Sequence, residues 1–367
     1  GSGYFDINAA GEVVVRPFGA RAATEISLIS QVHALAKRNL DMPVLIRFSN
    51  ILAARLEDIN ESFRRAIRDA GFRGKYRGVY PIKVNQQFDV VEDITEFGAK
   101  YHHGLEVGSK TELIAAVSCL KDHDALIICN GYKDEEFIDL ALHARFLGLQ
   151  TIIVVEMPNE FDLIIERAAR LKVRPRVGVR AKLSTRAGGH WDSSGGDRSK
   201  FGLDASQIVE LAGAMRQEKM LDCLQLLHYH LGSQVSDIRR IRTALQEACQ
   251  VYIGLQREGA RMGYLNIGGG LAVDYDGSRT NYASSTNYTT AEYAADVVEV
   301  IKKTFDEASV PHPTIVSESG RATVAHHSVM IFNILQASQV ETRRQAKPAP
   351  ENVHELRPVV GVRVNSL

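Results

Sequence analysis

Short apolar runs recur along the chain, and the segments between them carry apolar residues at the three- and four-residue spacing of helices. The candidate strands are residues 44–49, 77–84, 104–108, 125–130, 151–156, 176–181, 224–231, 264–267 and 314–318. Eight of these strands follow one another from 77–84 onward. They are nearly continuous apolar runs, which is typical of parallel strands that are buried on both faces. The pattern therefore predicts an α/β chain that closes into a (β/α)8 barrel, with a doubly wound open sheet as the alternative.

Two helix starts are marked by the spacing of a capping box, in which a serine or threonine precedes a glutamate by three residues. One pair is Ser109 and Glu112, and the other is Thr289 and Glu292. The second start is followed by one apolar stripe that we expect to face the core, formed by Ala294, Val297, Val298, Ile301 and Phe305.

Two segments do not fit this repeating pattern. Residues 186–200 form a long polar stretch rich in glycine and serine, which is typical of a binding loop or a lid. From residue 343 the pattern fades into the composition of a linker. We therefore expect residues 1–50 to lead into the barrel, residues 51–340 to form it, and residues 341–367 to be a linker or partial C-terminal segment.

Composition narrows the class of partner. The chain has 367 residues, 45% of them hydrophobic, and its 44 Lys and Arg residues balance 44 Asp and Glu residues. No basic field points to nucleic acid or to a membrane, so we expect a small-molecule substrate. The four cysteines are widely spaced and no apolar run approaches the roughly 20 residues of a membrane span, which together favour a reducing, cytoplasmic compartment.

Lys83 is the first residue that calls for a chemical explanation. It lies in the run Tyr-Pro-Ile-Lys-Val-Asn-Gln, which is typical of a buried strand. Burial disfavours an ammonium and lowers its pKa, and the neutral amine is the form that attacks an aldehyde to make a Schiff base. The structural alternative is a lysine at a strand end that extends its ammonium to water.

Two further strand ends carry polar or glycine residues. The glycines Gly268 to Gly270 follow the candidate strand 264–267 and would let backbone N–H groups approach a phosphate, or would simply form a tight turn. Glu318 ends the strand 314–318, and Arg321 follows three residues later. A carboxylate here suits the pyridine nitrogen of a pyridoxal phosphate, with the arginine near the phosphate, although a plain ion pair between the two is the alternative.

His228 and His230 would share one face of the candidate strand 224–231, because side chains alternate along a strand. One of them could stack flat on a cofactor ring. Alternatively, His228 is a core histidine, or the pair binds the metal of a barrel hydrolase, although the sequence shows no further ligand cluster.

Eight motifs in the same order give the chain a resemblance to a known family. They are Tyr-Pro-Ile-Lys-Val-Asn-Gln at 80–86, Leu-Glu-Val-Gly-Ser-Lys-Thr-Glu-Leu at 105–113, Cys-Asn-Gly-Tyr-Lys-Asp at 129–134, Val-Gly-Val-Arg-Ala-Lys-Leu at 177–183, Ser-Lys-Phe-Gly-Leu at 199–203, His-Leu-Gly-Ser-Gln at 230–234, Gly-Gly-Gly-Leu-Ala-Val-Asp-Tyr at 268–275 and Glu-Ser-Gly-Arg-Ala at 318–322. Over roughly residues 40–340 the chain resembles the biosynthetic arginine decarboxylases. These are similar to alanine racemase and to ornithine and diaminopimelate decarboxylases, in which a barrel that binds pyridoxal phosphate is joined to a β domain.

The resemblance implies a role for each matched residue. Lys83 would carry pyridoxal phosphate as a Schiff base, His230 would stack on its ring, and Glu318 would hold the pyridine nitrogen. The phosphate would be bound by Ser233, Gly268, Gly269, Gly270 and Arg321, while Glu106 and Arg180 would line the site. The implied reaction is decarboxylation of L-arginine to agmatine and carbon dioxide in polyamine and spermidine biosynthesis, by a homodimer or higher homo-oligomer whose site is completed across an interface. A magnesium requirement is also implied, although the sequence displays no magnesium site.

The chain departs from the family pattern after Glu318, where the Cys-Asp motif of the β domain does not appear. We therefore expect a C-terminally truncated chain whose N- and C-terminal segments belong to an incomplete β domain and which has little activity alone. A barrel that binds pyridoxal phosphate without turnover, or a decarboxylase of another basic or diamino acid, are the alternative functions.

Overall fold

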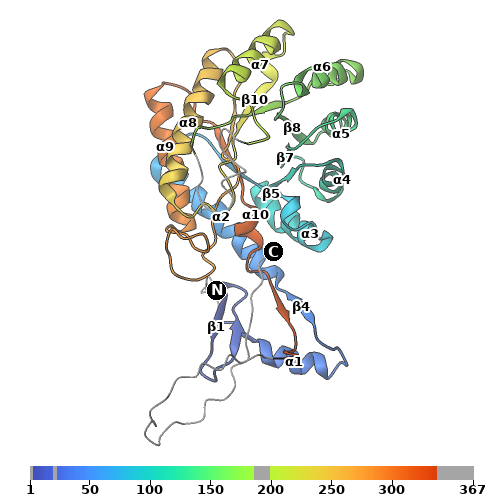
Figure 1. Cartoon of the computed structure of the whole chain (residues 1–367), viewed down its shortest axis with the longest axis vertical. Coiled ribbons are helices and arrows are strands. Elements are labelled where there is room, and N and C mark those ends of the chain that lie inside the picture. The colour runs from blue at the N-terminus through green and yellow to red at the C-terminus, as the bar shows by residue number, and fades with distance from the viewer. Residues whose placement is uncertain (1–2, 20–22, 186–198, 337–367) are drawn as a thin grey trace, which may run out of the picture.

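The computed structural model describes residues 3–19, 23–185 and 199–336. Within these ranges eight parallel strands close into a barrel in the order β5-β6-β7-β8-β9-β10-β11-β12. Helices surround the barrel in the upper part of Figure 1, and a smaller lobe lies below it. The predicted (β/α)8 barrel is confirmed, and the open doubly wound sheet is excluded because β12 pairs with β5. The predicted loop at 186–200, except for its last two residues, and the linker from residue 343 lie outside the described residues.

Every predicted barrel strand has a counterpart. The strands are β5 Tyr76–Pro81, β6 Gly104–Val107, β7 Leu126–Cys129, β8 Gln150–Val155, β9 Val177–Arg180, β10 Leu224–His228, β11 Tyr264–Asn266 and β12 Thr314–Glu318. The helices are α2 Ser49–Ala70, α3 Phe88–Gly98, α4 Lys110–Cys119, α5 Glu135–Phe146, α6 Glu160–Leu171, α7 Ala205–Gln217, α8 Ile238–Arg257, α9 Thr290–Glu307 and α10 Gly320–Val324, with short 3-10 turns at Ile82–Val84, Ala99–Tyr101 and Leu221–Cys223.

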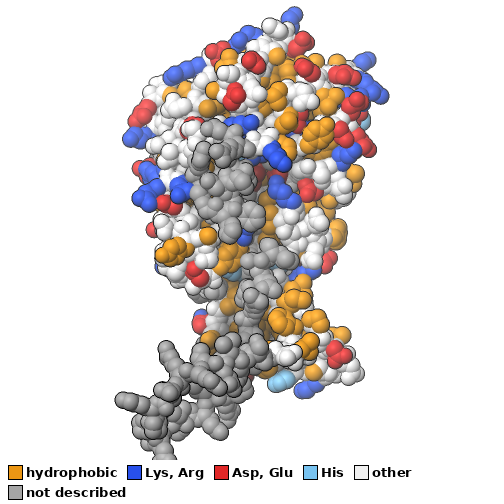
Figure 2. All heavy atoms as spheres, in the orientation of Figure 1, with side chains coloured by type: hydrophobic (Ala, Val, Ile, Leu, Met, Phe, Trp, Pro, Cys, Tyr) orange, Lys and Arg blue, Asp and Glu red, His pale blue; other side chains and the backbone are white. Residues whose placement is uncertain are grey.

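The smaller lobe combines segments that come before the barrel strands in the sequence with one segment that follows them. It contains the antiparallel sheet of β1 Phe5–Ile7, β2 Val13–Val15 and β3 Ile26–Ser27, the helix α1 Leu28–Ala36, and the pair β4 Val44–Arg47 with β13 Ser328–Ile331. Hydrophobic side chains gather on the surface of this lobe in Figure 2, and Leu45 and Met330, opposite each other on β4 and β13, are exposed. The N-terminal flank therefore forms β structure outside the barrel, as predicted. The predicted C-terminal segment 341–367 lies outside the described residues, and β13 instead comes from the stretch 51–340 that was predicted to form the barrel.

Local sequence explains where the outer helices begin. At α9 the Thr289 side chain accepts from the N–H of Glu292, and the Glu292 carboxylate accepts from the N–H of Thr289, which is the predicted capping box. Its predicted apolar stripe is buried. At α4 only half of the box forms, because the Glu112 carboxylate accepts from the N–H of Gly108 instead of from that of Ser109. No helix in the described part of the chain is long and apolar enough to span a bilayer.

The inside of the barrel changes from apolar to polar toward the carboxyl ends of the strands. An apolar cluster fills the interior, formed by Val79, Leu126, Ile128, Ile152, Val154, Leu226 and Val316. Alternation along the strands places the next inward side chains two residues further on. These form a polar layer: Glu106, Asn130, Glu156, Arg180, His228, Asn266 and Glu318. The site described next lies on this layer.

Candidate functional site

A cavity of about 490 Å³ opens at the carboxyl ends of the barrel strands. Seven residues that the sequence singled out line it: Lys83, His230, Ser233, Gly269, Gly270, Glu318 and Arg321. They come from the ends of β5, β10, β11 and β12 and from the loops that follow. Ligand sites of barrel enzymes lie at this end, so the fold brings the predicted residues together where a site is expected.

The structure corrects the prediction for Lys83. Strand β5 ends at Pro81, and Lys83 lies in the 3-10 turn that follows, with a side chain that is 58% exposed. The predicted buried strand lysine is therefore wrong, because the sheet pairing of this strand stops where Pro81 lies opposite Glu106. The turn lifts the lysine out of the strand and into the cavity.

Glu106 is the partner of Lys83. The Lys83 ammonium lies 3.1 Å from Glu106 Oε1 and 3.0 Å from Oε2, and the carboxylate is buried. Desolvation lowers the pKa of Lys83, but the charges of Glu106 and Glu318 have a larger effect and raise it. The sequence had predicted a lowered pKa, and this prediction is wrong. Burial and the charge of Glu318 raise the pKa of Glu106. The ammonium thus contacts one carboxylate, Glu106, and also feels the charge of a second one, Glu318.

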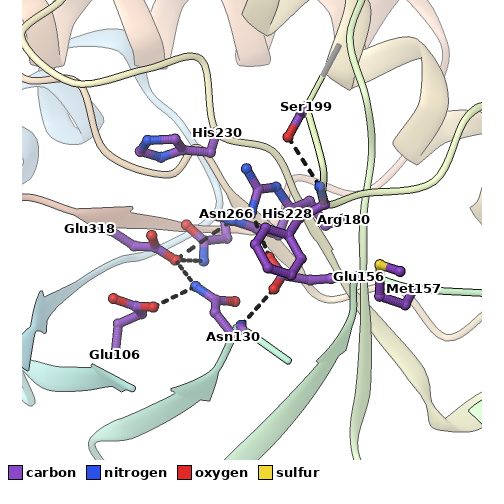
Figure 3. A network of polar contacts seen from close by, with 12 residues as sticks. Glu106, Asn130, Glu156, Met157, Arg180, Ser199, His228, His230, Asn266 and Glu318 are labelled. Carbon is purple, nitrogen blue, oxygen red and sulfur yellow. Dashed lines mark hydrogen bonds and ion pairs between the residues drawn. The ribbon is translucent and has the colours of Figure 1, made fainter. Parts of the chain in front are cut away.

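Glu318 is fixed by two buried amides that sequence reasoning missed. Asn130 Nδ2 lies 2.9 Å from Glu318 Oε1, and Asn266 Nδ2 lies 2.8 Å from the same oxygen (Figure 3). The hydrogen bonds found among the described residues leave Oε2 of this carboxylate without a donor. A signal was present in the sequence, since each asparagine follows an inward residue by two positions, Asn130 after Ile128 and Asn266 after Tyr264.

The two histidines do not share a strand. β10 ends at His228, which is buried with Nδ1 3.6 Å from Glu318 Oε1, whereas His230 lies beyond the strand and lines the cavity. Burial and the charge of Arg180 lower the pKa of both rings to about 3, so both are neutral near pH 7. A neutral ring in the position of His230 suits stacking on a cofactor better than a charged one would.

A metal site at these histidines has no support. The one group in the described part of the chain that could hold a metal ion is His102, Asp122 and Asp124. His102 and Asp122 come before β6 and β7, at the opposite end of the barrel from the cavity, and they already form a hydrogen bond with 2.8 Å between Nδ1 and Oδ2. In the described part of the chain, His228 and His230 therefore lack the further ligands that a metal-dependent hydrolase would need.

The glycine turn after β11 is shaped by close approach of neighbouring backbone. Gly268 has φ +64°, and a Cβ there would collide with the carbonyl oxygen of Tyr229. Gly270 has φ +112° and packs against Val235. Its neighbour Gly269 donates from its N–H to His230 Nδ1 at 3.3 Å. The turn therefore requires glycine and also orients the histidine ring.

Arg321 lies at the other side of the same cavity with two hydroxyl partners. Its guanidinium donates to Ser233 Oγ at 3.2 Å and to the Tyr275 hydroxyl at 3.0 Å, and it forms no ion pair with Glu318. Its Nε is buried and has no hydrogen-bond partner among the described residues. A buried donor without a partner is costly, and an anion at this position would satisfy it. Tyr275 is a further residue that sequence reasoning did not single out.

Arg180 occupies a different place from the one predicted. Its guanidinium lies 2.6 Å from Glu156 Oε1, and both side chains are largely buried, which strengthens this ion pair. Together with His230 it lines a small adjoining hollow, and it does not line the main cavity. Glu106 does not line the cavity either, but it contacts Lys83, which does.

The donor set fits pyridoxal phosphate. The cavity offers an amine at Lys83, a carboxylate oxygen of Glu318 without a donor, a neutral ring at His230, and a buried unpartnered N–H at Arg321 beside a glycine turn. Each of these protein groups matches one part of pyridoxal phosphate: its aldehyde, its ring nitrogen, the face of its ring and its phosphate.

Comparisons with known proteins agree with this chemistry. Residues 56–325 match the family model described as pyridoxal-dependent decarboxylase, pyridoxal binding domain. The biosynthetic arginine decarboxylase of Gloeobacter violaceus is 49% identical over 356 residues, which cover 97% of this chain and 55% of that protein. The crystal structure of the biosynthetic arginine decarboxylase of Campylobacter jejuni aligns with a TM-score of 0.80 at 32% identity, over 89% of this chain and 53% of that one.

A more distant neighbour supports the fold alone. The structure of diaminopimelate decarboxylase from M. jannaschii in complex with L-lysine aligns with a TM-score of 0.70 at 20% identity, over 90% of this chain and 69% of that one. The chain spans about half the length of the curated relatives it matches.

Proposed function

Because the chain belongs to the family of pyridoxal-dependent decarboxylases, we propose that the protein removes the carboxylate of L-arginine as carbon dioxide and releases agmatine. The relatives at 46–50% identity are named biosynthetic arginine decarboxylases, and this supports arginine over other amino acids. The observation that carries the proposal is the cavity in which Lys83, Glu318 and Arg321 converge.

Each residue of the cavity then has a task. Pyridoxal phosphate, when bound, supplies a positively charged ring that accepts the electrons of the broken carbon–carbon bond. Lys83 would hold the cofactor covalently, and Glu106 would keep a proton near its amine. Glu318 Oε2 would accept a hydrogen bond from the ring nitrogen and keep that nitrogen protonated. His230 would cover one face of the ring.

The phosphate would be bound on the opposite side. Ser233, Arg321 and the turn Gly268 to Gly270 form this part of the proposal, with Arg180 orienting the site through Glu156 instead of touching the ligand. The positive guanidinium would attract the anion, and the glycine turn, whose Gly269 N–H already donates to His230 Nδ1, would let the phosphate approach the backbone closely.

The proposal extends to the setting of the enzyme. We propose that residues 51–340 hold the barrel together with the strand β13 of the smaller lobe, that the segments 1–50 and 341–367 flank this unit, and that the protein is a cytoplasmic homo-oligomer that works in polyamine biosynthesis. Magnesium dependence and completion of the site across an interface are parts of the same proposal, and they rest on the family resemblance.

A substrate panel tests this function. The natural protein carrying this sequence is purified, loaded with pyridoxal phosphate and given L-arginine, L-ornithine, L-lysine or meso-diaminopimelate, while carbon dioxide and the amine product are measured. We expect agmatine from arginine at a rate well above that of the other three. Faster release from another amino acid would replace the substrate, and no release from any of them would favour a cofactor-binding protein without turnover.

A further inference from the structure

One amide group connects the two carboxylates of the site. Asn130 Nδ2 lies 3.0 Å from Glu106 Oε1 and 2.9 Å from Glu318 Oε1 (Figure 3). Both partners are carboxylates that accept, so the NH₂ group of the asparagine must face them. All three side chains are buried, with 5%, 1% and 6% exposure in the order given.

A neutral donor is a suitable group for this position. Two buried carboxylates repel each other, and each has lost the water that would otherwise donate hydrogen bonds to it. An amide donates one N–H to each carboxylate and adds no charge. With Asn266 also donating to Glu318 Oε1 at 2.8 Å, that oxygen is fully engaged and Oε2 is left for the ligand.

The backbone of Asn130 is held in place by several contacts. Its N–H donates to the carbonyl of Val107 at 2.8 Å, next to Glu106 on β6. Gly131 follows with φ +77°, and its N–H donates to Glu156 Oε2 at 2.5 Å. The Lys133 ammonium, fully buried, donates to the carbonyl of Gly131 at 2.6 Å and pairs with the buried Glu160.

These contacts hold the backbone at Asn130, whose side chain reaches Glu318 of the cavity lining. A buried lysine is costly, and the positive φ at residue 131 would be strained in any residue but glycine, so both features hold the backbone beside the amide that donates to both carboxylates. Asn130 Oδ1 is also buried and has no hydrogen-bond partner among the described residues, so the side chain is oriented by its donor end alone.

We propose that Asn130 is a positioning residue that turns Glu318 Oε2 toward the ring nitrogen of the cofactor and links Glu318 to Glu106. The inference rests on the proposed function only in that the chain binds pyridoxal phosphate. It assigns the asparagine of the Cys-Asn-Gly-Tyr-Lys-Asp segment to recognition of one atom of the ligand, the ring nitrogen.

The test compares two ligands that differ at that atom. Dissociation constants are measured by fluorescence titration for pyridoxal phosphate and for its analogue in which C–H replaces the ring nitrogen. The parent protein should prefer pyridoxal phosphate. Asn130→Ala should lower this preference about tenfold, the effect of losing one hydrogen bond to a charged group, while affinity for the analogue changes little. Glu318→Gln should lower the preference in the same way.

A matched control separates positioning from general damage. Asn60 is a buried asparagine that donates to the carbonyl of Leu56 at 2.8 Å and touches neither carboxylate, so Asn60→Ala removes a comparable hydrogen bond elsewhere. The Asn60→Ala variant should prefer pyridoxal phosphate over the analogue as strongly as the parent protein does. Asn130→Ser, which keeps a short donor, serves if the alanine variant does not fold, and it should also show a reduced preference.

The outcomes distinguish this inference from the proposed function. Equal losses of affinity for both ligands, or an unchanged preference in both Asn130 variants, would show that Asn130 only supports the fold. A parent protein that binds neither ligand would instead remove the proposed function. No step of the measurement uses arginine, so an error in the substrate would not affect the result.

Discussion

The ammonium of Lys83 lies 3.0 Å from Glu106 Oε2, on a carboxylate that is 1% exposed. This contact keeps the lysine charged, because the negative charges around it outweigh its desolvation and raise its pKa. The amine must lose its proton before it can attack an aldehyde. Glu106 therefore favours the resting form of Lys83 and provides a nearby group to take up the proton.

Glu106→Gln should shift the pH dependence of cofactor attachment to lower pH. The glutamine keeps the shape and an acceptor but removes the charge that raises the pKa of Lys83, so a larger share of the amine is neutral at a given pH. The rate of covalent attachment of pyridoxal phosphate to the cofactor-free protein is followed by absorbance from pH 6 to 10. A profile with the same midpoint as the parent would contradict this role of Glu106.

Lys83→Ala should abolish covalent attachment. Lys83 is the lysine that lines the cavity in the described part of the chain, and alanine has no amine to bond the aldehyde. Intact mass after borohydride reduction should show the added mass of the reduced cofactor in the parent and none in the variant. Lys110→Ala, which changes an exposed lysine paired with Asp134 and Glu136, should keep the added mass. A variant at Lys83 that still gains this mass carries the cofactor on another residue.

The sequence predicted the barrel well because the information was local. The strand Leu126–Cys129 is a continuous apolar run, and the helix α9 shows its own apolar stripe. The pairing of β4 with β13 could not be predicted in the same way, since the register of Leu45 opposite Met330 joins residues from the two ends of the described chain. Lys83 was placed on a strand because Tyr80 and Val84 suggested that the strand continued past Pro81.

Residues that line the cavity were singled out from the sequence, but the buried residues that support them were not. Glu318 and Arg321 stood out as charges at a strand end, whereas Asn130 and Asn266 are neutral and attracted no attention. Their importance arises from adjacency around the barrel, which brings the ends of β7, β11 and β12 onto one polar layer. A search for polar residues two positions beyond inward apolar ones would have found both.

Tyr275→Phe should weaken binding of pyridoxal phosphate about two- to tenfold. The hydroxyl holds the Arg321 guanidinium at 3.0 Å, and losing one hydrogen bond that orients a phosphate ligand costs about 0.5–1.5 kcal/mol. Pyridoxal, which lacks the phosphate, should bind the parent and the variant equally. Tyr282→Phe, an exposed tyrosine of the same loop, is the control for both ligands. Equal weakening for both ligands would place the effect of Tyr275 elsewhere than at the phosphate.

His103→Leu should make the protein more resistant to acid. His103 is 1% exposed and packed against Gly78 and Gly98, and neither ring nitrogen has a hydrogen-bond partner among the described residues. Burial lowers its pKa from 6.5 to about 4. The unfolded chain therefore binds a proton more readily than the folded one, so stability is complete above about pH 6.5 and falls as the pH decreases toward 4.

The size of the loss of stability in acid follows from the lowered pKa of His103. Between pH 8 and pH 5 the parent should lose roughly 2 kcal/mol of unfolding free energy through His103, and the leucine variant, which has no group to protonate, should lose that much less. Urea unfolding at the two pH values measures both losses. His33→Leu, at an exposed histidine, should follow the parent. If the His103 variant loses as much stability as the parent on acidification, then this ring is protonated in the folded protein as easily as in the unfolded chain, and its burial has no effect on the acid sensitivity of the fold.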